Sequence, residues 1–357
     1  MELTRVEAFG MNPKKCHEAP RLVSYIKMKA GEFGVDKSID IGAGQGYLSH
    51  LLVTKGGMRV VAIEGNEHNT HESAKRSKVI EKKMGIEGEF ETVSRMVTKD
   101  NIKEFTQEPC FLVGLHTCGD LSSLCLRLFA STPNIKGIIN VGCCYQHLSE
   151  YISPQSEPEV SSYLSRVDST FKSRSPDETL SSDPSTCGYP LSTYIKSQHS
   201  EFFLGRLPRT LSISEPQPLH SKSAELTFKK FQYRAAFQAL LQKHYPEYSM
   251  TYSIGNRIKD FQKFSKYALA AFTKMKIEST IEIEALDEFY DQNYKGLEKK
   301  SAIFWVIRSS LSNVIENLII LDRVLFLVEE GNHAEVLTIF DKLQSPRNIL
   351  VAGFKPG

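Results

Sequence analysis

The fold of this chain is decided by one short stretch, IDIGAGQG at residues 39–46. Three glycines, Gly42, Gly44 and Gly46, stand at alternate positions after an apolar segment and before residues with helical spacing. A backbone without Cβ atoms can turn tightly at positive φ and approach a ligand closely, while the amides that open the next helix face that ligand. The stretch therefore predicts a strand, a ligand-binding turn and a helix.

The segments around this turn alternate between strand and helix patterns. Short apolar runs predict strands at residues 38–41, 58–63, 90–93, 110–115 and 135–141. Residues with helical spacing lie between these runs, and such alternation is typical of a doubly wound, mostly parallel sheet. We therefore expect an α/β fold with a Rossmann-like core over residues 1–145.

The chain changes character after this core. Residues 150–188 are rich in Ser, Pro, Asp and Glu, which favours partial disorder. Residues 222–276 hold eleven Lys or Arg against three Asp or Glu, interleaved with aromatic side chains. We expect residues 146–300 to be a long, mostly helical and partly disordered insertion that interrupts the sheet.

The end of the chain is expected to return to the core. Residues 302–330 have the apolar density of a buried helix or helix pair. Residues 336–340 and 349–354 read as two strands around a Ser-Pro turn. Residues 301–357 are therefore predicted to supply a helix and a β-hairpin that complete the sheet.

Composition and charge exclude some classes of protein. A formal net charge of +2 and a pI near 8.0 are too close to neutral for the whole surface to bind polyanions, so any nucleic-acid site must be local. Residues 1–15 lack the apolar stretch of a secretion signal, and Asp322 and Arg323 interrupt the longest apolar run. Seven irregularly spaced cysteines fit reduced thiols. We expect a chain without a membrane span in the cytoplasm, the nucleus or both.

Two acidic residues identify the candidate ligand. Glu64 ends the second strand, where a carboxylate can accept both hydroxyls of a ribose. A nicotinamide dehydrogenase shares this layout, but Tyr47 stands where its third glycine would be. Asp40 suits a cofactor with a cationic amino-acid tail and would repel a pyrophosphate. The stretch thus favours S-adenosylmethionine in a class I methyltransferase sheet, with Gly42, Gly44 and Gly46 in the loop; a glycine turn without a ligand is the alternative.

Further motifs resemble a known family. They are NPKK at 12–15 followed by His17 and Glu18, HTCGDLS at 116–122, GCCY at 142–145, GYPLS at 188–192, ENLIILDR at 316–323 and SPRN at 345–348. Together they resemble the methyltransferase-like protein 25 family, including its relative labelled as a ribosomal-RNA adenine dimethylase domain protein. Two pieces, at 116–119 and 143–144, also resemble transfer-RNA 2'-O-methyltransferases that act on the acceptor stem. Family members carry a helical stretch before NPKK, so we expect a short form.

The carboxyl ends of the fourth and fifth strands should face the methyl acceptor. His116 could act as general base toward a hydroxyl or an amine and could also contact the cofactor; it could equally order its loop by hydrogen bonds. Asp120 and Lys14 complete the candidate catalytic set, although a solvated helix start would also explain Lys14. The Asn/Asp-Pro-Pro-aromatic motif of amine methyltransferases is missing after strand four, so the adenine-dimethylase label lacks support from the motif chemistry.

The candidate substrate-binding residues are Lys15, His17, Glu18, Cys143 and Tyr145. Only the family resemblance selects His17 and Glu18. The cysteines after strands four and five resemble the two-thiol arrangement of RNA cytosine-5 methyltransferases, in which a thiolate adds to a pyrimidine, but small buried residues are the commoner explanation. No metal is expected, because adjacent cysteines rarely chelate together and the chain lacks a Cys-x-x-Cys motif.

The acceptor is the least determined part of the prediction. RNA is the first candidate, with phosphates on Lys229, Lys230 and Arg234 and bases stacked on the neighbouring rings. An amphipathic helix with a solvated cationic face explains the same segment. A protein acceptor and a catalytically silent, cofactor-binding scaffold are the alternatives, and the sequence predicts no oligomeric state.

Overall fold

The computed structural model divides the chain into two compact units, which we describe separately. The first unit comprises Met1–Glu157, Asp177–Ile213 and Ile315–Gly357, and the second comprises Pro158–Pro176 and Ser214–Val314. The structure describes residues 2–85, 89–152, 180–181, 183–198, 204–214, 222–248, 258 and 260–357. Most of the segment expected to be disordered, residues 153–179 and 182, lies outside the described residues.

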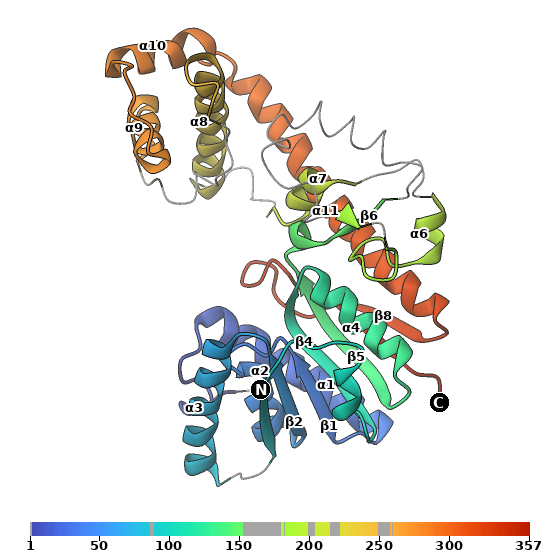
Figure 1. The fold of residues 1–357 in the computed structure, drawn as a ribbon. Helices are drawn as coiled ribbons and strands as arrows, with labels where there is room; N and C mark the ends of the chain where they lie inside the picture. Colours follow the sequence, from blue (N-terminus) through green and yellow to red (C-terminus); the bar gives the residue numbers. More distant parts are fainter. Residues whose placement is uncertain are drawn as a thin grey trace. The chain divides into compact units, whose positions relative to one another are not determined.

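A seven-stranded sheet organises the first unit, in the order β3-β2-β1-β4-β5-β9-β8 (Figure 1). Its strands are β1 (Lys37–Ile41), β2 (Arg59–Glu64), β3 (Phe90–Ser94), β4 (Cys110–Cys118), β5 (Ile135–Cys143), β8 (His333–Thr338) and β9 (Ile349–Phe354). The first five are parallel, while β9 and β8 pair antiparallel. The expected α/β sheet, completed by a C-terminal hairpin, is confirmed.

Helices cover both faces of this sheet, so most residues of the inner strands are buried whichever face they point to. On one face α1 (Pro13–Phe33) and α2 (Tyr47–Leu51) pack in a core that includes Leu22, Leu51 and Phe111. On the other face α4 (Asp120–Ser131) and the end of α11 (Glu298–Glu329) contribute Phe129 and Leu327. α3 (Glu67–Met84) follows β2.

Shorter elements connect the sheet of the first unit. They are η1 (Leu52–Gly56), η2 (Asn101–Glu104), η3 (Tyr145–His147), β6 (Glu150–Tyr151), β7 (Leu180–Ser181), α6 (Thr193–Gln198) and α7 (Arg206–Ser212). Asp322, buried in α11, accepts hydrogen bonds from the Leu191 and Ser192 amides, at 2.7 and 2.9 Å, and from the Ser192 hydroxyl. These bonds fix the segment before α6 against α11.

Two parallel strands run further than their apolar pattern suggests. β4 continues past Leu115 to Cys118 through a register shift, and β5 reaches Cys143. The backbone is left-handed at His116, with φ 65°, and at Cys144, with φ 53°. Non-glycine residues rarely adopt such angles, and strained positions of this kind cluster at functional sites.

Helices α8 (Lys222–His244), α9 (Phe264–Met275) and α10 (Ile283–Asn293) form the second unit with the start of α11. Tyr233, Phe237, Phe264 and Tyr267 are at most 5% exposed in its core, which leaves them no face on which a base could stack. The prediction of exposed stacking rings is therefore wrong at these positions, because the aromatic spacing belongs to packed helix faces.

α11 is one helix of 32 residues rather than a pair. The prediction that it is buried is wrong for its first half, where Ile303, Phe304 and Ile307 are each more than half exposed. The second half is buried because it lies on the sheet, where Leu327 contacts the backbone at Gly353. None of the helices that the structure describes is long and apolar enough to cross a membrane.

Candidate functional site

The three glycines of the loop between β1 and α2 all have positive φ: 68° at Gly42, 58° at Gly44 and 73° at Gly46. A Cβ atom on Gly46 would collide with the Ser73 hydroxyl, and one on Gly42 would lie 3.0 Å from a methyl group of Leu121. A Cβ on Gly44 would meet no described atom within 4 Å. The loop therefore packs against protein at two of its glycines and opens onto free space at Gly44.

Glu64 stands beside this opening. Its carboxylate accepts a hydrogen bond of 2.8 Å from the Gly44 amide and another of 2.8 Å from the Asn66 amide. The side chain is only partly buried, at the carboxyl end of β2. In parallel α/β sheets this edge is where ligands bind. The Glu64 carboxylate is thus a hydrogen-bond acceptor beside the loop. A ligand hydroxyl could donate to it in place of a backbone amide.

Asp40 has a different environment from Glu64. It lies 1% exposed, and one of its oxygens accepts a hydrogen bond of 2.6 Å from the Ser49 hydroxyl. Burial raises the pKa of Asp40 to about 7, although the Ser49 hydrogen bond and the charge of Lys15 act in the opposite direction. Asp40 therefore changes its charge near neutral pH, at the end of β1 directly before the glycine loop.

An open pocket of roughly 690 Å³, within the range of small-molecule sites, lies along α4 and is also lined by the segment after β3 and residues 184–186. Its lining includes Met96, Leu121 and Leu124. Leu121 also borders Gly42, and the Met96 sulfur lies against the backbone at Gly65, directly after Glu64. Neither Met96 nor Leu121 is among the candidate site residues predicted from the sequence. Their positions after β3 and in the first turn of α4 were the available signal, because both belong to the ligand-binding edge.

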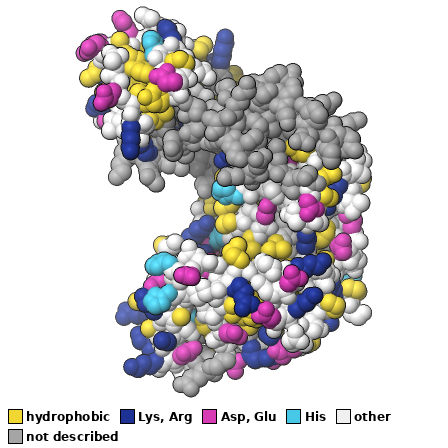
Figure 2. All heavy atoms as spheres, viewed as in Figure 1, with side chains coloured by type: hydrophobic (Ala, Val, Ile, Leu, Met, Phe, Trp, Pro, Cys, Tyr) yellow, Lys and Arg dark blue, Asp and Glu magenta, His cyan; other side chains and the backbone are white. Residues whose placement is uncertain are grey.

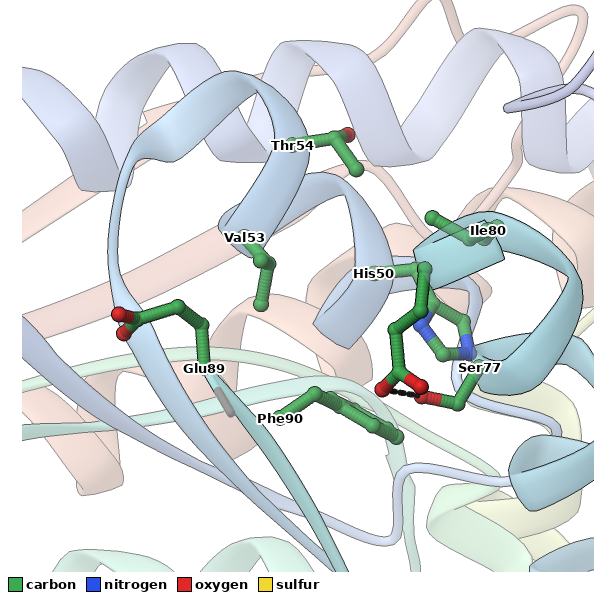
Figure 3. A pocket seen from close by; sticks show the side chains of 8 residues that line it. His50, Val53, Thr54, Ser77, Ile80, Glu89 and Phe90 are labelled. Atoms are coloured by element: carbon green, nitrogen blue, oxygen red, sulfur yellow. Dashed lines mark hydrogen bonds between the residues drawn. The ribbon is translucent and has the colours of Figure 1, made fainter. Parts of the chain in front are cut away.

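A second, smaller pocket lies behind the loop between α2, α3 and β3. Its lining includes His50, Ser77 and Phe90 (Figure 3). Burial lowers the pKa of His50 to about 3, so this ring is neutral. The pocket has room for about one water molecule. It is too small to hold a cofactor.

Glu18 gathers several predicted site residues around one buried carboxylate. It lies 2.8 Å from Nε2 of His116 and accepts a hydrogen bond of 2.6 Å from the Ser345 hydroxyl. The ammonium groups of Lys14 and Lys15 lie 3.6 and 3.8 Å from it. Burial alone would raise the pKa of Glu18, but the hydrogen bond and charge of His116 outweigh burial and lower it. Glu18 is therefore an anion that links α1 to the end of β4.

Three thiols meet at the ends of β4 and β5. The Sγ atoms of Cys118 and Cys143 are 3.3 Å apart, and those of Cys143 and Cys144 are 3.5 Å apart. The hydrogen bond from Cys143 lowers the pKa of Cys118 to about 6, with a further contribution from His116. The same hydrogen bond, together with burial, raises the pKa of Cys143. His116, two residues before Cys118 in the sequence, and His147 both favour the thiolate form of Cys118.

The remaining candidates, Asp120, Tyr145 and His17, make contacts of their own that do not involve the thiol groups. Oδ1 of Asp120 accepts a hydrogen bond of 2.8 Å from the Ser149 amide and so ties the start of α4 to the loop after β5. Tyr145 is 1% exposed, lies beneath the Arg323 guanidinium, and has a pKa raised to about 12 by burial. Nε2 of the buried His17 accepts a hydrogen bond of 2.9 Å from the Asp341 amide. Tyr145 and His17 are thus packed inside the fold, whereas a residue that contacts a substrate needs an exposed side chain.

Comparison with known proteins finds a methyltransferase domain and two curated relatives. A family model described as a methyltransferase domain matches residues 14–151. The curated mouse (Mus musculus) protein "Probable methyltransferase-like protein 25" is 30% identical over 251 residues, which cover 70% of this chain and 38% of that protein. The human (Homo sapiens) protein of the same name is 27% identical over 293 residues, covering 80% of this chain and 44% of that protein. The chain thus spans less than half the length of these relatives.

Two solved methyltransferase structures in complex with S-adenosyl-homocysteine show weaker similarity. TrmK from M. capricolum is 11% identical, with a TM-score of 0.25, and the alignment covers 70% of this chain and 92% of TrmK. The plantazolicin methyltransferase BpumL is 13% identical, with a TM-score of 0.27 and coverage of 63% and 88%. Similarity at this level carries no inference about the site. The sequence matches, in contrast, confirm the resemblance to the methyltransferase-like protein 25 family, and the glycine loop, Glu64 and the three clustered thiols all lie within the matched methyltransferase domain.

Proposed function

We propose that this chain is an S-adenosylmethionine-dependent methyltransferase. The observation that carries the proposal is the bare face of Gly44, which opens onto free space beside the Glu64 carboxylate. A carboxylate that accepts a backbone N–H there is equally able to accept the hydroxyls of a ribose. The family resemblance points to the same chemistry, because both curated relatives are named as methyltransferase-like.

Residues at the carboxyl edge of the sheet match the ribose, the adenine and the amino-acid tail of S-adenosylmethionine. Gly44 and Glu64 would hold the ribose, and the apolar side chains of Met96 and Leu121 offer a surface for the adenine in the pocket along α4. Asp40, when ionised, attracts the ammonium group of the amino-acid tail. The bound cofactor supplies an electrophilic methyl group on a sulfonium.

His116 is the proposed general base for the acceptor. Because the ionised Glu18 can only accept, the His116 nitrogen that contacts it, Nε2, carries a hydrogen in the neutral ring. The other ring nitrogen, Nδ1, is then the atom that can take a proton from a hydroxyl or amine. Glu18 is a positioning residue in this scheme, since it fixes the ring and its tautomer without touching the acceptor.

We further propose RNA as the acceptor. Charges of both signs are interspersed on the visible face of the structure, in keeping with the net charge of +2, so an RNA site has to be local (Figure 2). Lys14 and Lys15 supply such a local positive charge, since Glu18 holds both beside His116. A phosphate next to these ammonium groups would place a neighbouring ribose or base near the proposed general base. Lys229 and Lys230 of α8, in the second unit, are separate candidates for phosphate contacts.

Two measurements test the proposal. Titration calorimetry should detect one S-adenosylmethionine per chain, and none for Gly44→Asp, whose side chain fills the open space and whose charge faces Glu64. Chain incubated with radiolabelled cofactor and cell extract should then transfer label to material that ribonuclease removes. Label that resists ribonuclease but is lost with protease would replace RNA by a protein acceptor. Binding without any transfer would favour the silent scaffold, and no binding would refute the cofactor site.

A further inference from the structure

The thiols of Cys118, Cys143 and Cys144 form a group that the methyl-transfer scheme does not use. All three sulfur atoms lie within 4.8 Å of one another, at the carboxyl ends of β4 and β5. Cys118 and Cys143 are direct neighbours in the parallel pairing of these strands. Among the residues that the structure describes, this is the one group of His, Cys, Asp and Glu side chains whose ligand atoms converge in this way.

The backbone explains why consecutive cysteines converge here. Successive side chains of an extended strand point to opposite faces, which is why adjacent cysteines seldom bind one ion together. Cys144 departs from the extended conformation, with φ 53° and ψ 45°, and this left-handed turn brings its sulfur to 3.5 Å from that of Cys143. The register shift after Leu115 carries Cys118 level with Cys143. The left-handed residue at Cys144 and the register shift after Leu115, both locally unfavourable, together bring the three sulfurs into one group.

The chemistry of the donors selects the ligand. Thiolates prefer soft or borderline ions and discriminate against Mg²⁺ and Ca²⁺, which take oxygen ligands. A tetrahedral zinc ion with Zn–S distances of about 2.3 Å holds its sulfurs about 3.8 Å apart. The separations of 3.3 and 3.5 Å in the structure need to widen by only about half an ångström to reach that geometry.

We propose that Cys118, Cys143 and Cys144 bind a zinc ion through three thiolates. Three S–H bonds break as three Zn–S bonds form, and the three protons pass to the solvent. The resulting centre has a net charge of −1, and Lys15, an electrostatic neighbour of Cys143, compensates it. Cys118 is exposed, so the fourth coordination position can take water or a group of the acceptor, as in zinc sites with three protein ligands.

Such an ion would clamp the two strand ends that face the acceptor. This proposal does not depend on methyl transfer, because metal binding can be measured directly on the chain without cofactor. Failure of the zinc site and failure of the proposed function are therefore distinguishable.

The test is to purify the chain under reducing conditions, measure its zinc content by mass spectrometry, and titrate the metal-free chain with Co²⁺. We expect one zinc per chain, and a Co²⁺ adduct with thiolate charge-transfer and tetrahedral ligand-field absorption. Cys118→Ser is the first variant, because an exposed position tolerates the change. It should weaken Co²⁺ binding at least ten-fold, and the triple serine variant should abolish the charge-transfer band. Cys16→Ser, which lies outside the cluster, should behave as the wild type.

Three results would overturn the proposal. One is a reduced wild-type chain that binds no more zinc than the triple serine variant. Another is an equal loss of Co²⁺ affinity in Cys16→Ser. The third is a disulfide between Cys118 and Cys143 that persists in the reducing buffer, since their sulfurs would then be unavailable as ligands. Circular dichroism of Cys118→Ser confirms that its fold is intact before the titrations are compared.

Discussion

Replacing Gly44 by alanine tests whether the open face of the glycine loop holds a ligand. The chain offers a matched control in Gly57, which also has positive φ, 69° against 58° at Gly44. At both positions an added Cβ meets no described atom within 4 Å. Gly57 is the C-cap of η1, whereas Gly44 lies beside Glu64. The two substitutions therefore place the same strain in the backbone but differ in whether a cofactor would meet the new methyl group.

The expected magnitudes follow from this difference. A left-handed conformation costs a non-glycine residue about 1–2 kcal/mol, so both variants should lose that amount of unfolding free energy. At Gly44 the methyl group also occupies the free space that we assign to the cofactor. We expect S-adenosylmethionine to bind Gly44→Ala at least ten-fold more weakly, a difference of about 1.4 kcal/mol or more. The affinity of Gly57→Ala should stay within a factor of about two of wild type.

Chemical denaturation measures the stability difference, and titration calorimetry with S-adenosylmethionine measures binding. Similar stability loss in both variants, with weaker binding in Gly44→Ala alone, is the expected pattern. Equal affinities for the two variants would refute the argument, because the space beside Gly44 would then not be part of the ligand site. A much larger stability loss in Gly44→Ala would show that the loop is packed rather than open.

Three other predictions have defined outcomes. Cofactor binding should tighten by up to about ten-fold from pH 6 to pH 8, because Asp40 has a pKa of about 7 and only its ionised form attracts the ammonium tail. Asp40→Asn should flatten the pH profile measured by calorimetry. A sloping profile in that variant contradicts the role assigned to Asp40. Glu18→Gln removes a buried anion held by His116 and Ser345, and should lower the unfolding free energy by about 1–3 kcal/mol, as measured by urea denaturation. A change below about 0.5 kcal/mol would count against the buried ion cluster. Asp322→Ala leaves three buried donors unpaired and should lower the unfolding free energy by about 3 kcal/mol or more. Glu329→Ala removes an exposed acceptor of the Thr193 and Tyr194 amides and should lower the unfolding free energy by less than about 1 kcal/mol. Equal losses in the two variants would contradict the role of burial.

The five parallel strands could be predicted because each is a local pattern. A strand buried on both faces reads as a continuous apolar run, and β1 ends directly at the glycine loop. The strand predicted at residues 336–340 begins three residues after the start of β8, because His333, Ala334 and Glu335 have no strand pattern of their own. Their pairing with Phe354, Gly353 and Ala352 is a long-range effect that a local reading of sequence does not contain.

The site shows the same division between local and long-range information. Gly44 and Glu64 follow their strands directly, so the sequence predicts their place at the binding edge. The contact of Glu18 with Ser345 joins residues 327 positions apart, and no local pattern encodes it. The thiol group depends on a left-handed residue at Cys144, which amino-acid type alone does not predict. The sequence therefore predicts the loop and several of the residues near it, but not the contacts through which the fold brings those residues together.

The most direct test of the cofactor site is a crystal structure of the chain with S-adenosyl-homocysteine. The hydroxyls of the ribose should bind the Glu64 carboxylate, and the hydrogen bond of 2.8 Å that now joins this carboxylate to the Gly44 amide should be displaced. The adenine should contact Met96 and Leu121. A structure in which Glu64 keeps its bonds to the Gly44 and Asn66 amides while the ligand lies elsewhere would contradict the account.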